Sequence, residues 1–216
     1  MATYATYEEM KTEINLVDAR KPERGNIERL LDSASAAIDR FCNRPLGFVA
    51  LTVAAAKVYP GSGKPYQLID ECVTITAVAV KDSVSDAAYT AWLATDWTAC
   101  TGDYNYPDFN STPYTMLLCT ANGDYSVFSS GRMADRWQAP TVQVTARWGY
   151  ALTVPDQIKT ATIMQAARWF KRLQGSMSDA LASGELGRLL FLQKLDPDIA
   201  MILKDGRFVH PAVGRW

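Results

Sequence analysis

The spacing of apolar residues changes twice along this chain of 216 residues, and this change limits the folds open to it more than any other feature. Over 26–42, and again over 155–173, apolar residues recur every three or four positions, the period of an amphipathic helix. Over 49–148 the residues are β-branched, aromatic or small, and the runs 73–80 and 141–148 alternate at period two. The pattern predicts an α+β chain with a β-rich middle.

Two helices are predicted before this middle. Thr6 and Glu9 have the spacing of a capping box, in which each side chain accepts the other residue's backbone N–H, and they mark the start of a short first helix. A second helix is predicted over 26–42, after a break at Pro22 and Gly25. Its apolar residues lie on one side, as in a helix that packs against a core: Ile27, Leu30, Leu31, Ala34, Ile38 and Phe41.

A long helix is predicted near residues 155–173. Proline at its first position and Asp156 in its first turn favour a helix start, and Gly175 is expected to end the helix. Its apolar residues lie on two sides, so we expect neighbours on both. The glycine- and serine-rich stretch 174–187 is predicted to be a linker. Two short helices are expected after it, over 185–195 and from Asp196–Pro197 to Gly206.

Turn-forming residues divide the β-rich middle. Residues 60–64, Pro-Gly-Ser-Gly-Lys, resemble a phosphate-binding loop only faintly, because they follow a strand and do not lead into a helix. A hairpin turn is predicted there instead. The segment 101–114 is predicted to be a loop, and a weak strand is predicted over 125–128.

The fold expected from these patterns is a small helical bundle, in which the N-terminal helices pack with the long helix. The bundle carries a β-rich insertion, a helical C-terminal region and an extended tail. The predicted parts are an N-terminal helical part of the core over 1–48, the insertion over 49–148, the long core helix over 149–174, the C-terminal helices over 175–206 and a docking tail over 207–216.

Composition is that of a folded protein made in a cytoplasm. Hydrophobic residues make up 48% and charged residues 21%, which argues against disorder. No apolar run approaches the roughly 20 residues that span a bilayer, so no membrane association is expected. The first thirteen residues lack the features of a signal peptide. The cysteines are widely spaced, which favours buried free thiols over a metal site: Cys42, Cys72, Cys100 and Cys119.

The charge is nearly balanced overall but unevenly distributed. A formal net charge of −1 argues against a general nucleic-acid binder. Residues 1–146 hold 12 basic and 17 acidic residues, whereas residues 147–216 hold 10 basic and 6 acidic ones. Such asymmetry is typical of a chain whose ends meet different partners, and equally of two solvated faces.

Few residues are suited to catalysis. The single histidine, His210, lies in the terminal segment, whereas a catalytic base is normally held on a rigid scaffold. The acidic pair Asp70–Glu71 is expected to be solvated and Asp196 to cap a helix, although a hydrolase's carboxylate pair would look the same in sequence. We therefore expect no enzymatic activity, no cofactor and no metal ion.

Seven aromatic residues gather in the segment 89–114. They either form an exposed surface for sugars, bases or a protein partner, or they fill a β-rich core or a subunit interface, and the second interpretation is favoured. No lysine or arginine lies between Lys81 and Arg132, which weakens the nucleic-acid interpretation. The residues are Tyr89, Trp92, Trp97, Tyr104, Tyr106, Phe109 and Tyr114.

The last ten residues contain two large apolar side chains, Phe208 and Trp216, without an obvious local core. Chain termini are usually disordered unless they dock. The segment is therefore expected either to fold back or to bind a partner protein, and the partner is favoured. The predicted interface residues are Arg207, Phe208, Val209, His210, Arg215 and Trp216.

Two segments, taken in order, resemble the head–tail connector (adaptor) family of long-tailed phages. The first is LLDSASAAIDRFCNRPL at residues 30–46. The second is ARWGY at 146–150, followed by VPDQIK at 154–159 and the helical segment 161–171. Family members place an "LL..A...I...C.RP" pattern early and a "GY…VP..I" pattern after a β-rich insert. The resemblance covers about a quarter to a third of the chain and includes no catalytic signature.

The resemblance implies a structural virion protein of the neck, between capsid and tail. Connectors form a ring, commonly of about a dozen subunits, under the portal protein at one capsid vertex. The ring extends the DNA channel without binding DNA specifically, and it offers the attachment surface for a stopper or tail-completion protein. The partners implied are other copies of the chain, the portal protein and the stopper. The chain's own C-terminal segment 207–216 would dock on the portal. The alternative function is a carbohydrate- or protein-binding module that uses the aromatic loop 89–114.

Overall fold

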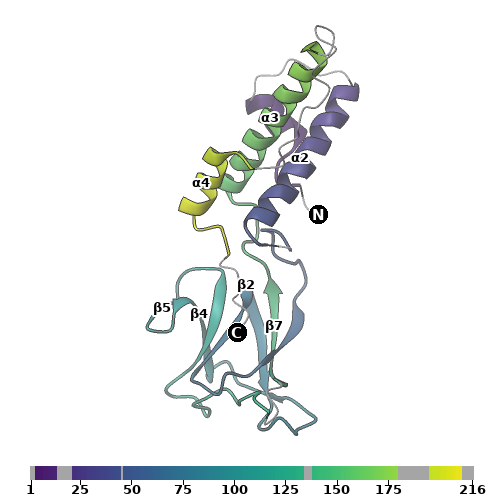
Figure 1. Cartoon of the computed structure of the whole chain (residues 1–216). Helices are drawn as coiled ribbons and strands as arrows, with labels where there is room; N and C mark the ends of the chain where they lie inside the picture. Colours follow the sequence, from purple (N-terminus) through teal and green to yellow (C-terminus); the bar gives the residue numbers. More distant parts are fainter. Residues whose placement is uncertain (1–2, 14–20, 45, 134–137, 180–194, 211–216) are drawn as a thin grey trace. The chain divides into compact units, whose positions relative to one another are not determined.

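The computed structural model describes residues 3–13, 21–44, 46–133, 138–179 and 195–210 (Figure 1). The chain divides into two compact units: a helical unit, residues 1–48 and 154–216, and a sheet unit, residues 49–153. The described residues form four helices and one antiparallel sheet of seven strands. The prediction of a mixed α+β chain is confirmed at this level.

The helical unit is built on the packing of helix α2, Lys21–Phe41, against helix α3, Asp156–Asp179 (Figure 1). The predicted stripe of α2 faces this shared core, because its members at three- and four-residue spacing lie on one side of the helix. Helix α1, Tyr7–Glu13, adds two side chains to the same core. The core contains Tyr7, Met10, Ile27, Leu31, Ala34, Ile163, Ala166, Ala167 and Phe170.

Helix α2 begins earlier than predicted, at Lys21, so Pro22 and Gly25 lie inside it. Pro22 falls in the first turn, where a backbone N–H has no helical partner to lose. Gly25 costs about 1 kcal/mol relative to alanine, and the packing of the stripe outweighs this cost.

Helix α3 ends later than predicted, because it continues through Gly175 to Asp179. The predicted linker over 174–187 is therefore helical at its start. Its remainder, and the helix predicted over 185–195, lie outside the described residues.

Helix α4, Pro197–Asp205, begins and ends where the sequence predicts. The Asp196 carboxylate accepts the N–H of Asp198 at 3.1 Å, and Gly206 follows the last turn. Arg168 of α3 pairs with both aspartates, which fixes the start of α4 against α3. The predicted cap is confirmed.

The capping box of α1 is also confirmed. The Glu9 carboxylate accepts the N–H of Thr6 at 2.8 Å, and the Thr6 hydroxyl oxygen accepts the N–H of Glu9 at 3.3 Å. The Lys159 ammonium donates to the other Glu9 oxygen at 2.8 Å, so the cap also ties α1 to α3. The lysine and the Thr6 N–H hold the pKa of Glu9 below its ordinary value.

The sheet unit has the strand order β1-β7-β2-β6-β4-β5, with β3 paired to β2, and every pair is antiparallel. The last strand in sequence therefore lies between the first two. The strands are β1 Ala55–Pro60, β2 Tyr66–Val80, β3 Thr90–Ala91, β4 Trp97–Asp103, β5 Tyr106–Asp108, β6 Tyr114–Cys119 and β7 Pro140–Trp148.

Three predictions for the sheet unit are wrong. The turn at 60–64 is not a hairpin turn, because β7 separates the two strands that it joins. The segment 101–114 is not a loop throughout, since it contains the end of β4 and all of β5. Residues 125–128 form no strand; their aromatic rings stack on Trp92 instead of joining a ladder.

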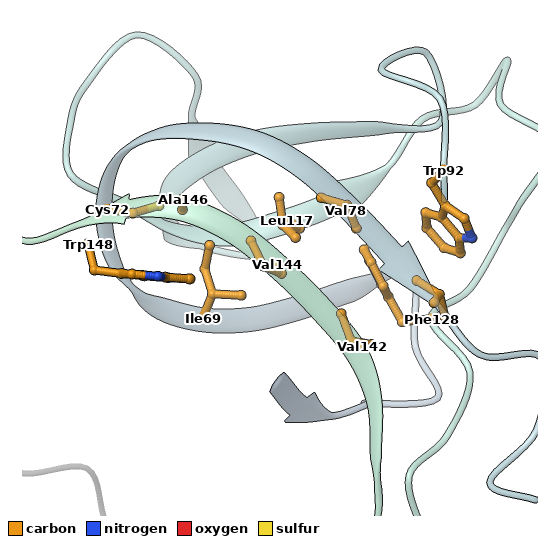
Figure 2. Packing of buried hydrophobic residues seen from close by; sticks show 11 residues of the cluster. Ile69, Cys72, Val78, Trp92, Leu117, Phe128, Val142, Val144, Ala146 and Trp148 are labelled. Atoms are coloured by element: carbon orange, nitrogen blue, oxygen red, sulfur yellow. The ribbon is translucent and has the colours of Figure 1, made fainter. Parts of the chain in front are cut away.

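The core of the sheet unit lies inside the curved strands (Figure 2). Strand β7 alternates as predicted, with Val142, Val144 and Ala146 buried. Strand β2 changes register at three places, and such irregularities let one long strand bend to pair with both β7 and β6. Figure 2 shows Trp148 at one end of the core and Trp92 with Phe128 at the other.

The chain enters and leaves the sheet unit at adjacent points. The Ala50 N–H donates to the Ala151 carbonyl at 2.8 Å, and the Leu51 N–H donates to the Trp148 carbonyl at 2.8 Å. Gly149 fits between these bonds with φ +140°, and a Cβ placed there would lie 2.4 Å from the Ala50 Cα. Glycine is the residue that this close approach allows.

We expect Gly149→Ala to destabilise the sheet unit by about 2 to 4 kcal/mol, because it combines a positive φ with a backbone clash. Chemical denaturation followed by tryptophan fluorescence measures the change. Gly25→Ala is the matched control: nothing lies within 4 Å of its added Cβ, so it is expected to stabilise by about 0.5 to 1 kcal/mol. Equal effects of the two substitutions would contradict the packing described at Gly149.

We expect Glu9→Gln to lower stability slightly at neutral pH and to flatten its dependence on acid. A carboxyl group whose pKa is lowered by folding stabilises the fold above its unfolded pKa of about 4.5, and this contribution is lost as the pH falls through the folded pKa. The difference from wild type should therefore vanish at strongly acidic pH. Thermal unfolding as a function of pH measures it, with Glu8→Gln as a control that leaves the bonds to Thr6 and Lys159 intact.

Candidate interaction surface

The C-terminal segment returns to the end of α2. After Gly206, the Phe208 N–H donates to the Leu203 carbonyl at 3.0 Å. The Phe208 ring is 6% exposed and meets the Phe48 ring edge-on, with 5.8 Å between centroids. The His210 N–H donates to the Cys42 carbonyl at 2.9 Å. Of the two alternatives for Phe208, the structure therefore shows that it folds back onto its own chain, which was the less favoured one.

The other predicted docking residues differ in exposure. Arg207 is exposed, and Val209 and His210 are half-buried. Arg215 and Trp216 lie outside the described residues. Removing all ten residues from 207 onward would also remove Phe208 from the core, so a test of docking has to keep residues 207–210.

Arg44 anchors this return of the chain, a role that its sequence context did not reveal. Its Nε donates to the Phe208 carbonyl at 2.9 Å, and its guanidinium lies 5.0 Å from the Phe48 ring centroid. Nearby, the Tyr4 hydroxyl donates to the buried Asp39 carboxylate and accepts the Phe48 N–H at 3.0 Å. Burial raises the pKa of Asp39 despite the hydrogen bond from Tyr4. These contacts together stabilise the helical unit where the C-terminal segment meets the end of α2.

Six of the seven aromatic residues of 89–114 divide into two sets; the seventh, Tyr89, is half-buried, and its hydroxyl donates to the Pro140 carbonyl at 3.1 Å. Trp92 is buried, and Trp97 and Tyr114 pack against the core of the sheet unit. The second set lies on the β4–β5 hairpin and the loop after it, and its members are exposed: Tyr104 by 44%, Tyr106 by 85% and Phe109 by 47%. The core interpretation holds for the first set, and the second set is left as a surface.

A shallow hollow of about 410 Å³ lies beside this hairpin. It brings together β2, the end of β4 and β6, because the Tyr104 ring reaches the Tyr66 ring with 4.6 Å between centroids. Leu68, on the same strand as Tyr66, is 56% exposed. The lining of the hollow is Tyr66, Leu68, Gly102, Asp103, Tyr104 and Met116. The sequence reasoning missed the β2 residues, because nothing local links them to a loop about 40 residues away.

The cysteines and Asp70, the remaining candidates for a metal or catalytic site, lie in surroundings that suit a structural role. All four cysteines are free, and burial raises the pKa of Cys42 and Cys72 to about 12, so both stay as thiols. Asp70 lies inside β2, half-exposed, and pairs with Lys57 at 2.6 Å. In the part of the chain that the structure describes, no three His, Cys, Asp or Glu side chains are grouped to hold a metal ion. None of the helices described is long and apolar enough to cross a bilayer.

No protein-family model and no curated protein sequence matches the chain. Among solved structures, the chain is similar to one in the neck of an empty GTA particle computed with C6 symmetry. The two share 15% sequence identity over 76% of each chain, with a TM-score of 0.45.

Proposed function

We propose that this chain is a structural virion protein, a head–tail connector that forms a ring under the portal at one capsid vertex. The supporting observation is where the two connector-like segments lie. The first supplies Leu31 and Ala34 of α2, and the second supplies Ala166, Ala167 and Phe170 of α3; these residues share one core. Segments more than a hundred residues apart in sequence thus form one packing unit, as expected of a family signature that specifies a scaffold.

Other residues of the two segments also have physical roles. Arg44, the arginine of the "C.RP" pattern, holds the C-terminal segment through the Phe208 carbonyl. Gly149, in the "GY" pattern, permits the close approach to Ala50. These roles concern architecture rather than chemistry, which supports a proposal without catalysis or cofactor.

The proposed assembly has the sheet unit inserted into a single helical bundle, about a dozen copies in the ring, and DNA passing through the lumen without specific contacts. A ring subunit meets its neighbours through two unlike surfaces. The portal protein lies on one side and a stopper or tail-completion protein on the other. The protein is placed in the neck of the virion after synthesis in the host cytoplasm.

A second candidate function is a binding module, and the exposed aromatic hairpin favours it. Tyr106 exposes 85% of its surface at a two-residue turn, and aromatic side chains so placed commonly anchor a partner. This function is compatible with the first, because a neck protein must offer a surface to its neighbour.

We expect purified phage particles from the source of this chain to contain about a dozen copies of it, one ring at a unique vertex. Quantitative mass spectrometry against the major capsid protein measures the copy number. A chain abundant in infected cells but absent from particles would remove the connector proposal, whereas hundreds of copies would indicate a shell protein.

We expect deletion of residues 211–216 to weaken binding to the portal protein without unfolding the chain. The deletion keeps Phe208 and the His210–Cys42 hydrogen bond, so the helical unit retains these two contacts. Co-purification with the portal measures binding, and circular dichroism checks the fold. Phe208→Ala is the contrasting variant, since it should lower the melting temperature through a cavity worth about 3 to 5 kcal/mol. If the protein that lacks residues 211–216 binds the portal as tightly as wild type does, the docking role of this segment is contradicted.

A further inference from the structure

One face of the β4–β5 hairpin combines an exposed ring with two carboxylates. Tyr106 is the direct cross-strand partner of Asp103, so their Cβ atoms are neighbours. Asp108 follows Tyr106 by two positions on β5 and points to the same side. Both aspartates are exposed. A hydrogen bond from Ser111, with the N–H of Asn110, holds the pKa of Asp108 below its ordinary value, so this carboxylate is charged at neutral pH.

One cation of this chain already contacts Tyr66, a residue that lines the neighbouring hollow. The Lys64 ammonium lies 5.2 Å from the Tyr66 ring centroid and donates to the Tyr66 hydroxyl at 3.0 Å. Tyr66 in turn contacts Tyr104 across the hollow, and Asp103 lines it. The surface therefore has the electrostatic character that receives an ammonium or guanidinium group: the faces of aromatic rings with a carboxylate beside them.

The surrounding chain reinforces this character. Residues 82–131 contain six aspartates and no lysine or arginine. Asp86 is half-buried and accepts the Ser83 N–H, and the buried Asp96 accepts the N–H groups of Leu93 and Asp124. Asp103 accepts the Asn105 N–H, and Asp108 accepts hydrogen bonds from Asn110 and Ser111, but both carboxylates stay exposed. Asp103 and Asp108 thus keep negative charge beside the exposed rings.

We propose that this hairpin surface binds a cationic segment of a partner protein, with an arginine or lysine side chain held over Tyr106 between Asp103 and Asp108. The inference rests on the hairpin being a binding surface and names the partner's chemistry; it does not depend on ring assembly. A cation gains from the rings and from both carboxylates together. A neutral sugar would gain from the rings alone, and an anionic partner would be repelled.

The test uses the full-length protein and a fluorescent peptide of alternating glycine and arginine, with a citrulline peptide as the neutral match. Fluorescence anisotropy at low and high salt measures binding. We expect the arginine peptide to bind and the citrulline peptide not to. Tyr106→Ala should weaken binding about 3- to 10-fold, whereas Tyr106→Phe keeps the ring and should bind as wild type does. Asp103→Asn with Asp108→Asn should weaken binding further and reduce its dependence on salt.

Two controls separate this site from a general attraction to an acidic chain. Asp124→Asn removes the same charge from an exposed position outside the hollow, and Leu93→Ala removes an exposed apolar side chain elsewhere. Both should bind as wild type does. Lys64→Met removes the chain's own cation and should tighten binding.

Equal binding of the two peptides, equal losses in the Asp103→Asn, Asp108→Asn double variant and in Asp124→Asn, or no binding at all would overturn the inference. Binding of neutral oligosaccharides that Tyr106→Ala abolishes, without binding of the arginine peptide, would keep the hairpin as a binding surface and remove the cation from it. Neither result bears on the copy number in particles, which tests the connector proposal separately.

Discussion

The sheet unit depends on one close contact between backbones, that of Gly149 with Ala50. A Cβ at position 149 would lie 2.4 Å from the Ala50 Cα. The segments by which the chain enters and leaves the sheet unit can therefore approach this closely only when residue 149 is glycine. The contact also positions the first strand of the sheet. Trp148, the preceding residue, is buried, and its indole N–H donates to the Ala55 carbonyl at 2.7 Å, while Lys57 lies over its ring at 4.6 Å. Strand β1 is therefore held on the edge of β7 from its first residue.

How much of this could be read from the sequence depends on whether the signal is local. The stripe of α2 and the alternation of β7 were predictable, because each is fixed by one segment and one buried face. The hairpin turn at 60–64 was predicted wrongly for the opposite reason: turn residues report a reversal but not that β7, about 80 residues later, pairs between the two strands. Gly175 failed as a helix end, since tertiary packing of α3 overrides a propensity cost of about 1 kcal/mol.

In the candidate surfaces too, features set by local sequence were predicted and those set by distant contacts were not. Phe208 was expected to seek a partner because nothing near it in sequence is apolar enough to bury it. Its actual partners, Phe48 and Arg44, are distant in sequence: Arg44 precedes Phe208 by 164 positions. For the aromatic segment the core or interface interpretation was favoured, but part of the set is exposed, because alternation could not assign each ring. The pairing of β4 with β6 places Trp97 against the core, whereas the pairing of β4 with β5 leaves Tyr106 in solvent.

The aspartates between Lys81 and Arg132 are only partly explained by hydrogen bonding within turns. An excess of aspartate in a loop-rich stretch is ordinarily explained by turn capping, and Asp96 fits that explanation, since it is 2% exposed and accepts N–H groups from Leu93 and Asp124. Capping requires one oxygen and tolerates a basic neighbour, so it does not explain why the stretch between Lys81 and Arg132 contains no base at all. A cation placed on this hairpin by the chain itself would occupy the ring faces, as Lys64 does at Tyr66. The absence of any further base in this stretch of the sequence keeps Tyr106 open to a cation from outside the chain.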